Sequence, residues 1–146
     1  MNDISDISLP AARSIIAGAF AHAESAGFNP MAVVVLDRGG HIRAFERADG
    51  ASNGRFEIGF GKAHGALSLG MGSRSIMARA EQQPYFIAAV TSAVGGSLVP
   101  VPGGVLVRDT GGGLLGAVGV TGDTSDNDEA AAVAGIEGAG LTAQAE

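Results

Sequence analysis

The sequence predicts an α+β fold, in which helices cover a mostly antiparallel sheet of about five strands. Three observations predict it. An amphipathic helical pattern opens the chain, two pairs of apolar segments are each joined by a short glycine-rich turn, and a capped helix closes the chain. Because a short turn pairs neighbouring strands antiparallel, this order of elements excludes a doubly wound nucleotide-binding fold.

The first helix has clear signals at both ends. Ser8 can cap a helix that begins near Leu9 and Pro10, since proline is tolerated in a first turn. Gly27 ends the helix, and Pro30 follows. Apolar residues recur at helical spacing, at Leu9, Ala12, Ile15, Ile16, Ala19, Phe20 and Ala23.

Two hairpins follow the same plan. Residues 31–36 form an apolar, β-branched strand, and the turn at 37–40 joins it to a strand at 41–47. Residues 105–108 and 114–120 form the second pair, across the turn Asp109-Thr110-Gly111-Gly112-Gly113. Gly111-x-Gly113-x-x-Gly116 matches the dinucleotide fingerprint, but that motif needs a helix after it, and here a strand continues. A hairpin turn is therefore the favoured interpretation.

The middle of the chain is predicted to be helical. After a loop at 49–54, a second helix places Phe56, Phe60, Ala63 and Leu67 on one face. A third helical stretch covers 75–82, Pro84 breaks it, and a short helix covers 85–93. The segment from Gly95 to Gly104 is a constrained loop.

Four acids precede or open the last helix. Asp123, Asp126, Asp128 and Glu129 resemble a cation-binding loop, but an EF-hand starting at Asp123 would need Gly at 128 and Glu at 134. A helix capped by Thr124 or Ser125, whose first-turn acids complement the helix dipole, is favoured. Functional acids are the alternative.

Composition narrows the function classes. Charged residues are only 16% of the chain and Gly numbers 24, so we expect a single domain over residues 1–146 that hides surface in a homo-oligomer. The net charge of −6 and scattered cations argue against nucleic acid, and no cysteine is present. Without a basic, apolar leader or a membrane-length apolar run, we expect a cytoplasmic protein with no membrane partner.

His22 is the first candidate site residue. It falls along the apolar stripe of the first helix. A lone histidine on such a face is usually a satisfied core or interface residue, and a haem or metal ligand is the alternative.

A second candidate site lies on the second helix. Glu57, Gly61 and His64 share one helix face, and Gly61 would leave a gap that admits a ligand against the backbone. With Lys62 nearby, such a pocket could transfer protons. An exposed salt-bridged face is the alternative. Asp49 and Tyr85 join the candidate set if the fold brings them to the same pocket.

Several motifs together resemble the GlcG/HbpS family, which includes the C-terminal domain of PduO-type corrinoid adenosyltransferases. The resemblance covers nearly the whole chain, and its specificity lies in the order and spacing of the motifs. The motifs are residues 33–40 (VVVLDRGG), 47–51 (RADGA), Glu57 with Lys62-Ala63, Gly103-Gly104 with residues 116–122 (GAVGVTG), and Asp128-Glu129.

The resemblance implies a profilin-like sandwich, assembly into a homo-oligomer, from a dimer to an octamer, and, in some members, haem bound by a histidine of the first helix. His22 would then be the cofactor ligand, and Gly103, Gly104 and Gly122 would contact a small ligand. Val99-Pro100-Val101-Pro102 departs from the family's glycine-rich rim, which favours a smaller ligand.

Two hypotheses follow. The first is a small-ligand-binding protein, with haem as a possible cofactor. The second is a cofactor-independent acid/base isomerase or lyase acting on a small hydroxylated or unsaturated compound. In the second, Glu57 or Asp49 is the base, Lys62 or Arg79 holds negative charge, and Tyr85 or His64 donates a proton.

Overall fold

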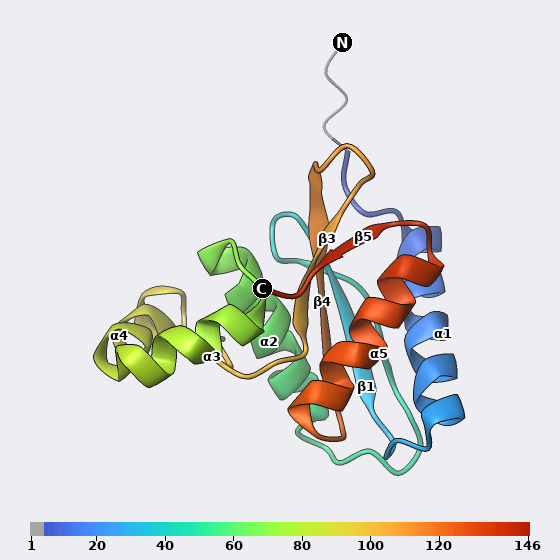
Figure 1. Cartoon of the computed structure of the whole chain (residues 1–146), viewed down its shortest axis with the longest axis horizontal. Helices are drawn as coiled ribbons and strands as arrows, with labels where there is room; N and C mark the ends of the chain where they lie inside the picture. The colour runs from blue at the N-terminus through green and yellow to red at the C-terminus, as the bar shows by residue number, and fades with distance from the viewer. Residues whose placement is uncertain (1–4) are drawn as a thin grey trace.

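The computed structural model describes residues 5–146 and confirms the α+β class (Figure 1). Residues 1–4 lie outside the described part, and so does the start of the segment on which the expectation about a leader rests. The helices are α1 (Leu9–Ala26), α2 (Arg55–Leu69), α3 (Ser73–Gln82), α4 (Pro84–Ala93) and α5 (Ser125–Gly138). The strands are β1 (Ala32–Asp37), β2 (Ile42–Arg47), β3 (Gly104–Arg108), β4 (Leu114–Thr121) and β5 (Thr142–Gln144).

The sheet is antiparallel throughout, in the order β2-β1-β4-β3-β5. Both predicted hairpins are confirmed, as β1–β2 and β3–β4. They join at the centre of the sheet, where β1 pairs with β4 and Val34 lies opposite Gly119. The glycine motif at 111–113 is the turn between β3 and β4, as predicted. Strand β5, which pairs with β3, was not predicted.

The predicted caps of the first and last helices are confirmed. Ser8 Oγ accepts a hydrogen bond from the N–H of Ala11, and Gly27 ends α1 with a φ of 73°, in the left-handed region that suits glycine. Thr124 caps α5 by accepting from the N–H of Asn127.

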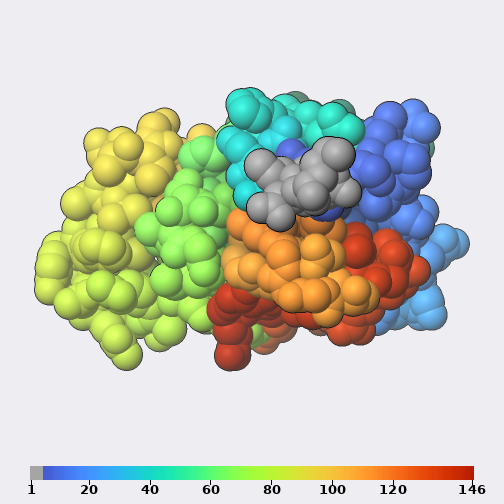
Figure 2. Space-filling model, turned by 90° about the horizontal axis from the view of Figure 1, so that it is seen from above, coloured from blue at the N-terminus to red at the C-terminus, as the bar shows by residue number. Residues whose placement is uncertain are grey.

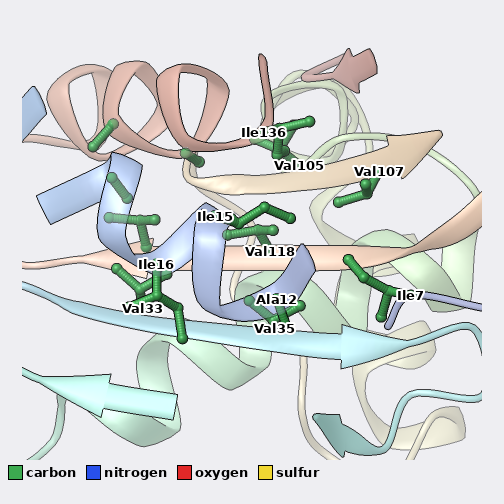
Figure 3. Packing of buried hydrophobic residues seen from close by; sticks show 14 of the residues in the cluster. Ile7, Ala12, Ile15, Ile16, Val33, Val35, Val105, Val107, Val118 and Ile136 are labelled. Carbon is green, nitrogen blue, oxygen red and sulfur yellow. The ribbon is translucent and has the colours of Figure 1, made fainter. Parts of the chain in front are cut away.

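One face of the sheet packs against α1 and α5, which contact each other closely (Figure 3). Ile15 and Ile16 of α1 meet Val33 and Val118 of the sheet within one continuous apolar cluster. The two helices touch through glycine, since a Cβ on Gly135 would overlap the carbonyl oxygen of Ile15. Glycine at this position therefore lets α1 and α5 approach each other closely over the sheet.

The opposite face packs against α2. Ala63 and Ala66 lie on Val34, Leu106 and Ala117. The four apolar positions predicted for one face of this helix all belong to this cluster. Small residues bring the helix close to the sheet, and a Cβ on Gly119 would overlap the carbonyl oxygen of Gly59.

Helices α3 and α4 form a lobe to one side of the sandwich (Figures 1 and 2). Ile76, Ile87 and Leu98 form its buried apolar cluster. In α4 only Ile87 is buried, and Tyr85 is 71% exposed. Among the described residues, no helix combines the length and hydropathy that crossing a membrane requires.

Candidate functional site

An open groove of about 290 Å³ lies where the C-terminal part of α1 meets the chain around it. Its walls are mainly apolar, and Glu24 and Asp49 add two exposed carboxylates. The groove is lined by Phe20, Ala23, Glu24, Phe28, Asn29, Pro30, Met31, Ala48 and Asp49. Of the residues predicted for a site, only Asp49 lines it.

The end of α1 builds this groove. After Gly27, the N–H of Phe28 bonds to the carbonyl of Ala23 at 2.9 Å, which closes the end of the helix. Residues 28–31, hereafter the groove wall, then run towards β1. The N–H of Ala48 bonds to the carbonyl of Met31 at 3.0 Å, which fixes the opposite side.

His22 lies beside the groove and not in it. Its ring packs edge-on against Phe28, with 5.6 Å between ring centroids. Phe20 and Glu24 line the groove, and residues two apart on a helix point in different directions. Phe28 therefore contacts His22 and also lines the groove. Within residues 5–146, neither ring nitrogen of His22 has a hydrogen bond, and its side chain is half-buried.

The other two histidines have polar partners. His41 Nδ1 lies 3.3 Å from Asp37 in the exposed β1–β2 turn. His64 Nδ1 lies 2.8 Å from the carbonyl oxygen of Ser97, and its ring stacks on Phe60 at 5.3 Å. Because a carbonyl only accepts, Nδ1 of His64 carries the hydrogen in the neutral ring, and Nε2 keeps its lone pair.

Lys62 forms a buried ion pair with Asp128. Its Nζ lies 3.1 Å from Asp128 Oδ2 and 3.0 Å from the carbonyl oxygen of Val120, and both side chains are 2% exposed. Burial lowers the pKa of Lys62 and raises that of Asp128, with each charge opposing the shift of the other. The predicted role of Lys62 in holding a ligand's negative charge would require it to leave Asp128.

The gap predicted at Gly61 is absent, which corrects that expectation. The side chain of Val99 fills it, since a Cβ on Gly61 would lie 2.6 Å from Val99 Cγ2. The N–H of Val99 also bonds to the carbonyl of Gly61 at 3.1 Å. Glu57 is exposed at one end of this face and His64 is half-buried at the other, so the two groups share no pocket at Gly61.

The three predicted ligand-contacting glycines are close-packed against protein. A Cβ on Gly103 would lie 2.9 Å from Lys62 Nζ, and one on Gly104 would overlap the carbonyl of Lys62. A Cβ on Gly122 would meet Pro30 and Met31 from behind the groove wall. These glycines allow close approach around Lys62 and behind the wall, and none lines the groove.

Arg79 and Tyr85 belong to the α3–α4 lobe. The guanidinium of Arg79 lies 4.5 Å from the ring centre of Phe86 and donates to Gln83 Oε1 at 2.6 Å. Gln83 in turn donates to the hydroxyl of Tyr85 at 3.2 Å. The predicted acid/base residues are thus divided among the groove, α2 and this lobe.

The acids of α5 have specific protein partners. Asp126 and Glu129 both bind Arg74 of α3, and Asp126 and Asp128 lie in the first turn, as the dipole interpretation predicted. In the part of the chain that the structure describes, no three His, Asp or Glu side chains gather as a metal site.

Sequence reasoning missed most of the groove. Phe20 and Ala23 were assigned to the core stripe of the first helix, and the aromatic Phe28 directly after the helix-ending Gly27 was not singled out. Glu24, one turn before Gly27, was the available polar signal.

Comparison with known proteins agrees with this architecture. A family model described as "Haem degrading protein HbpS-like" matches residues 7–137. No curated protein matches the chain by sequence. Protein ORFY of Klebsiella pneumoniae shares 26% identity and a TM-score of 0.83, over 96% of this chain and 97% of ORFY.

Two further solved structures have the same fold, and one of them is a haem complex. A double mutant of Streptomyces reticuli HbpS is 27% identical, with a TM-score of 0.77, over 94% of this chain and 89% of HbpS. A PduOC:heme complex has a TM-score of 0.82 at 20% identity, over 93% of this chain and 96% of PduOC, and so shares the fold.

Proposed function

The chain belongs to the HbpS-like family, and from that premise we propose that it is a single-domain protein that binds a small ligand in the groove beside α1. The observation that carries the proposal is the groove itself, with its apolar walls and its two exposed carboxylates. Ligand sites in proteins combine apolar walls with a few placed polar groups in this way.

The finer proposal is that the ligand is haem. It is supported by the family description and by the haem complex of PduOC, which has this fold. The apolar side chains of Phe20, Phe28 and Met31 suit a porphyrin. A volume of about 290 Å³ is at the lower end of ligand sites, so the groove would hold only part of a haem. Glu24 and Asp49 would repel the propionates, which would therefore face solvent.

His22 is the histidine that we propose as the iron ligand. An iron ligand needs a free imidazole nitrogen, and the ring of His22 has no hydrogen bond within residues 5–146. Phe28 links its ring to the groove. His64 is the natural rival, because its Nε2 is free while Nδ1 donates to a carbonyl, the arrangement common in metal-bound histidines.

The three histidines make a matched test. Haemin is titrated into the wild type and into His22→Ala, His64→Ala and His41→Ala, and the Soret band is followed. The proposal expects a red-shifted band in the wild type and in the last two variants, and its loss in His22→Ala. A wild type whose Soret band does not shift would exclude haem as the ligand. Loss of the shifted band in His64→Ala alone would make His64, on α2, the iron ligand.

A second pair of variants tests the groove. Ala48→Trp fills the space beside Asp49, whereas Ala130→Trp adds the same side chain to an exposed position of α5. Haemin affinity measured by titration should fall at least tenfold in the first variant and stay constant in the second. Equal haemin affinities in the two variants would show that haem does not bind in the groove.

Self-association is part of the same proposal. Helix α4 has no charged residue and buries only Ile87, so an apolar surface remains exposed in the single chain. We propose that a homo-oligomer covers it. Light scattering coupled to gel filtration should give a multiple of the chain mass, and Ala89→Glu, in the middle of this surface, should reduce it. A monomeric wild type would contradict the proposal.

A further inference from the structure

Asp123 connects the groove wall to the opposite end of the sequence. Its Oδ1 accepts a hydrogen bond from the N–H of Asn29 at 2.8 Å, and Asn29 lines the groove. Its Oδ2 accepts from the N–H of Thr124 at 2.9 Å and from Asn127 Nδ2 at 2.7 Å. The carboxylate is therefore held by α5 on one side while it holds the groove wall on the other.

The backbone of Asp123 is held in turn by the buried pair. Its N–H donates to Asp128 Oδ1 at 2.9 Å, and the other oxygen of Asp128 binds Lys62 at 3.1 Å. Because Lys62 and Asp128 are both almost completely buried, this end of the connection is fixed in the core. An unbroken series of hydrogen bonds thus runs from Lys62 to Asn29.

The residue before Asp123 supports the same wall by packing. Gly122 lies so close behind Pro30 and Met31 that a Cβ there would meet the Met31 Cα at 2.5 Å. Capping of α5 explains the contacts of Asp123 with Thr124 and Asn127, but it does not require the contact with Asn29. That contact has a consequence only for the groove wall.

We propose that Asp123 is the positioning residue of the groove, because it ties the wall at Asn29 to the buried Lys62–Asp128 pair. The inference rests on the proposed function only in taking the groove as the ligand site. Asp123 itself does not line the groove, so it acts through the Asn29 backbone and not by touching the ligand.

Amide hydrogen exchange tests the connection without any ligand. Asp123→Ala should raise the exchange rate of the amides of Phe28, Asn29 and Met31 at least tenfold, while the amide of Val34 in the core of β1 stays protected. Asp126→Ala is the matched control, since it removes an equal charge from the same segment but contacts Arg74 and not the wall. Unchanged exchange at Asn29 in Asp123→Ala would overturn the inference, and so would an equal rise at Val34, which would signal general destabilisation.

Haemin titration of the same variants tests the effect on binding. Asp123→Ala should weaken haemin binding by about tenfold, the usual effect of losing an outer residue that orients a site. Asp123→Asn, which keeps one oxygen for Asn29, should restore most of the affinity. If Asp123→Ala raises amide exchange at the groove wall but binds haemin as tightly as the wild type, Asp123 holds the wall but has no role in ligand binding, and the positioning role is wrong. If the wild type binds no haemin, the haem proposal fails, and amide exchange alone decides the inference.

Discussion

Two regions of the molecule treat their charged residues differently. Where α2 meets the start of α5, Lys62 and Asp128 are buried together and neutralise each other. Beside α1, Glu24 and Asp49 remain exposed at the edge of an apolar groove. Lys62, which sequence reasoning placed near a catalytic pocket on α2, is thus part of the structural framework, whereas the open groove lies elsewhere. A residue type that can perform acid/base chemistry is a site residue only where the fold lets a ligand reach it.

The largest effect should come from breaking the buried pair. Lys62→Met leaves Asp128 buried without its partner, which should cost about 3–5 kcal/mol of unfolding free energy. The directions of both pKa shifts show that desolvation dominates this pair, so Lys62→Met with Asp128→Asn should recover much of the loss. Urea unfolding of the three proteins measures this. A single variant as stable as the wild type would remove the contrast between the buried pair and the exposed carboxylates.

Filling the closed contact at Gly61 should have the next largest effect. Gly61→Ala would press on Val99 and should cost about 1–3 kcal/mol, because close-packed interiors resist added volume. The control is Gly138→Ala, at a position with open space, which should be neutral or stabilising by up to about 1 kcal/mol. Thermal unfolding compares them. Equal melting temperatures for both variants would show that a ligand-sized gap can open at Gly61 after all.

Changing the open carboxylates should affect binding and leave stability unchanged. Glu24→Gln and Asp49→Asn should each raise haemin affinity about two- to fivefold, since exposed charges interact by less than about 1 kcal/mol. Glu137→Gln, an exposed acid of α5, should leave affinity unchanged. Weaker binding in the two groove variants would indicate a cationic or hydroxylated ligand instead.

The smallest effect concerns pH at the groove wall. The hydrogen bond from Asn29, together with those from Asn127 and Thr124, lowers the pKa of Asp123 from its ordinary value of 3.8. The folded state therefore releases this proton at a lower pH than the unfolded chain does. The stabilisation is complete above pH 3.8 and is lost as pH falls through the lowered value. An NMR titration of the Asn29 amide should show a midpoint below 3.8, and a midpoint at or above 3.8 would contradict the bond.

The fold was largely predictable because its signals are local. Ser8 and Gly27 mark the ends of α1, and each hairpin is defined by its own turn. Strand β5 escaped prediction because three residues, Thr142–Gln144, are too few to show a strand pattern. The order of the strands was also beyond local reasoning, since it depends on pairing between β1 and β4.

The site was predicted less well because its contacts are distant in sequence. Nothing near Lys62 indicates that Asp128 neutralises it, and nothing near Gly61 indicates that Val99 fills its gap. Asp49 was singled out for its chemistry, but nothing near it in the sequence indicates that Glu24 of α1 lines the same groove. Spacing predicts which residues share an element, and only the fold decides which elements meet.

The sheet order also has a consequence for how the chain folds. Each hairpin closes across a short turn, whereas β1 and β4 must find each other across the whole of α2, α3 and α4. Closing that long loop is the costly step, so we expect the pairing of Val34 with Gly119 to limit the folding rate. The entropy of closure grows only slowly with loop length, by about 0.6 kcal/mol per doubling. The α3–α4 lobe lies inside this loop, so relatives of this chain can lengthen or shorten the lobe with little change in how fast the sheet assembles.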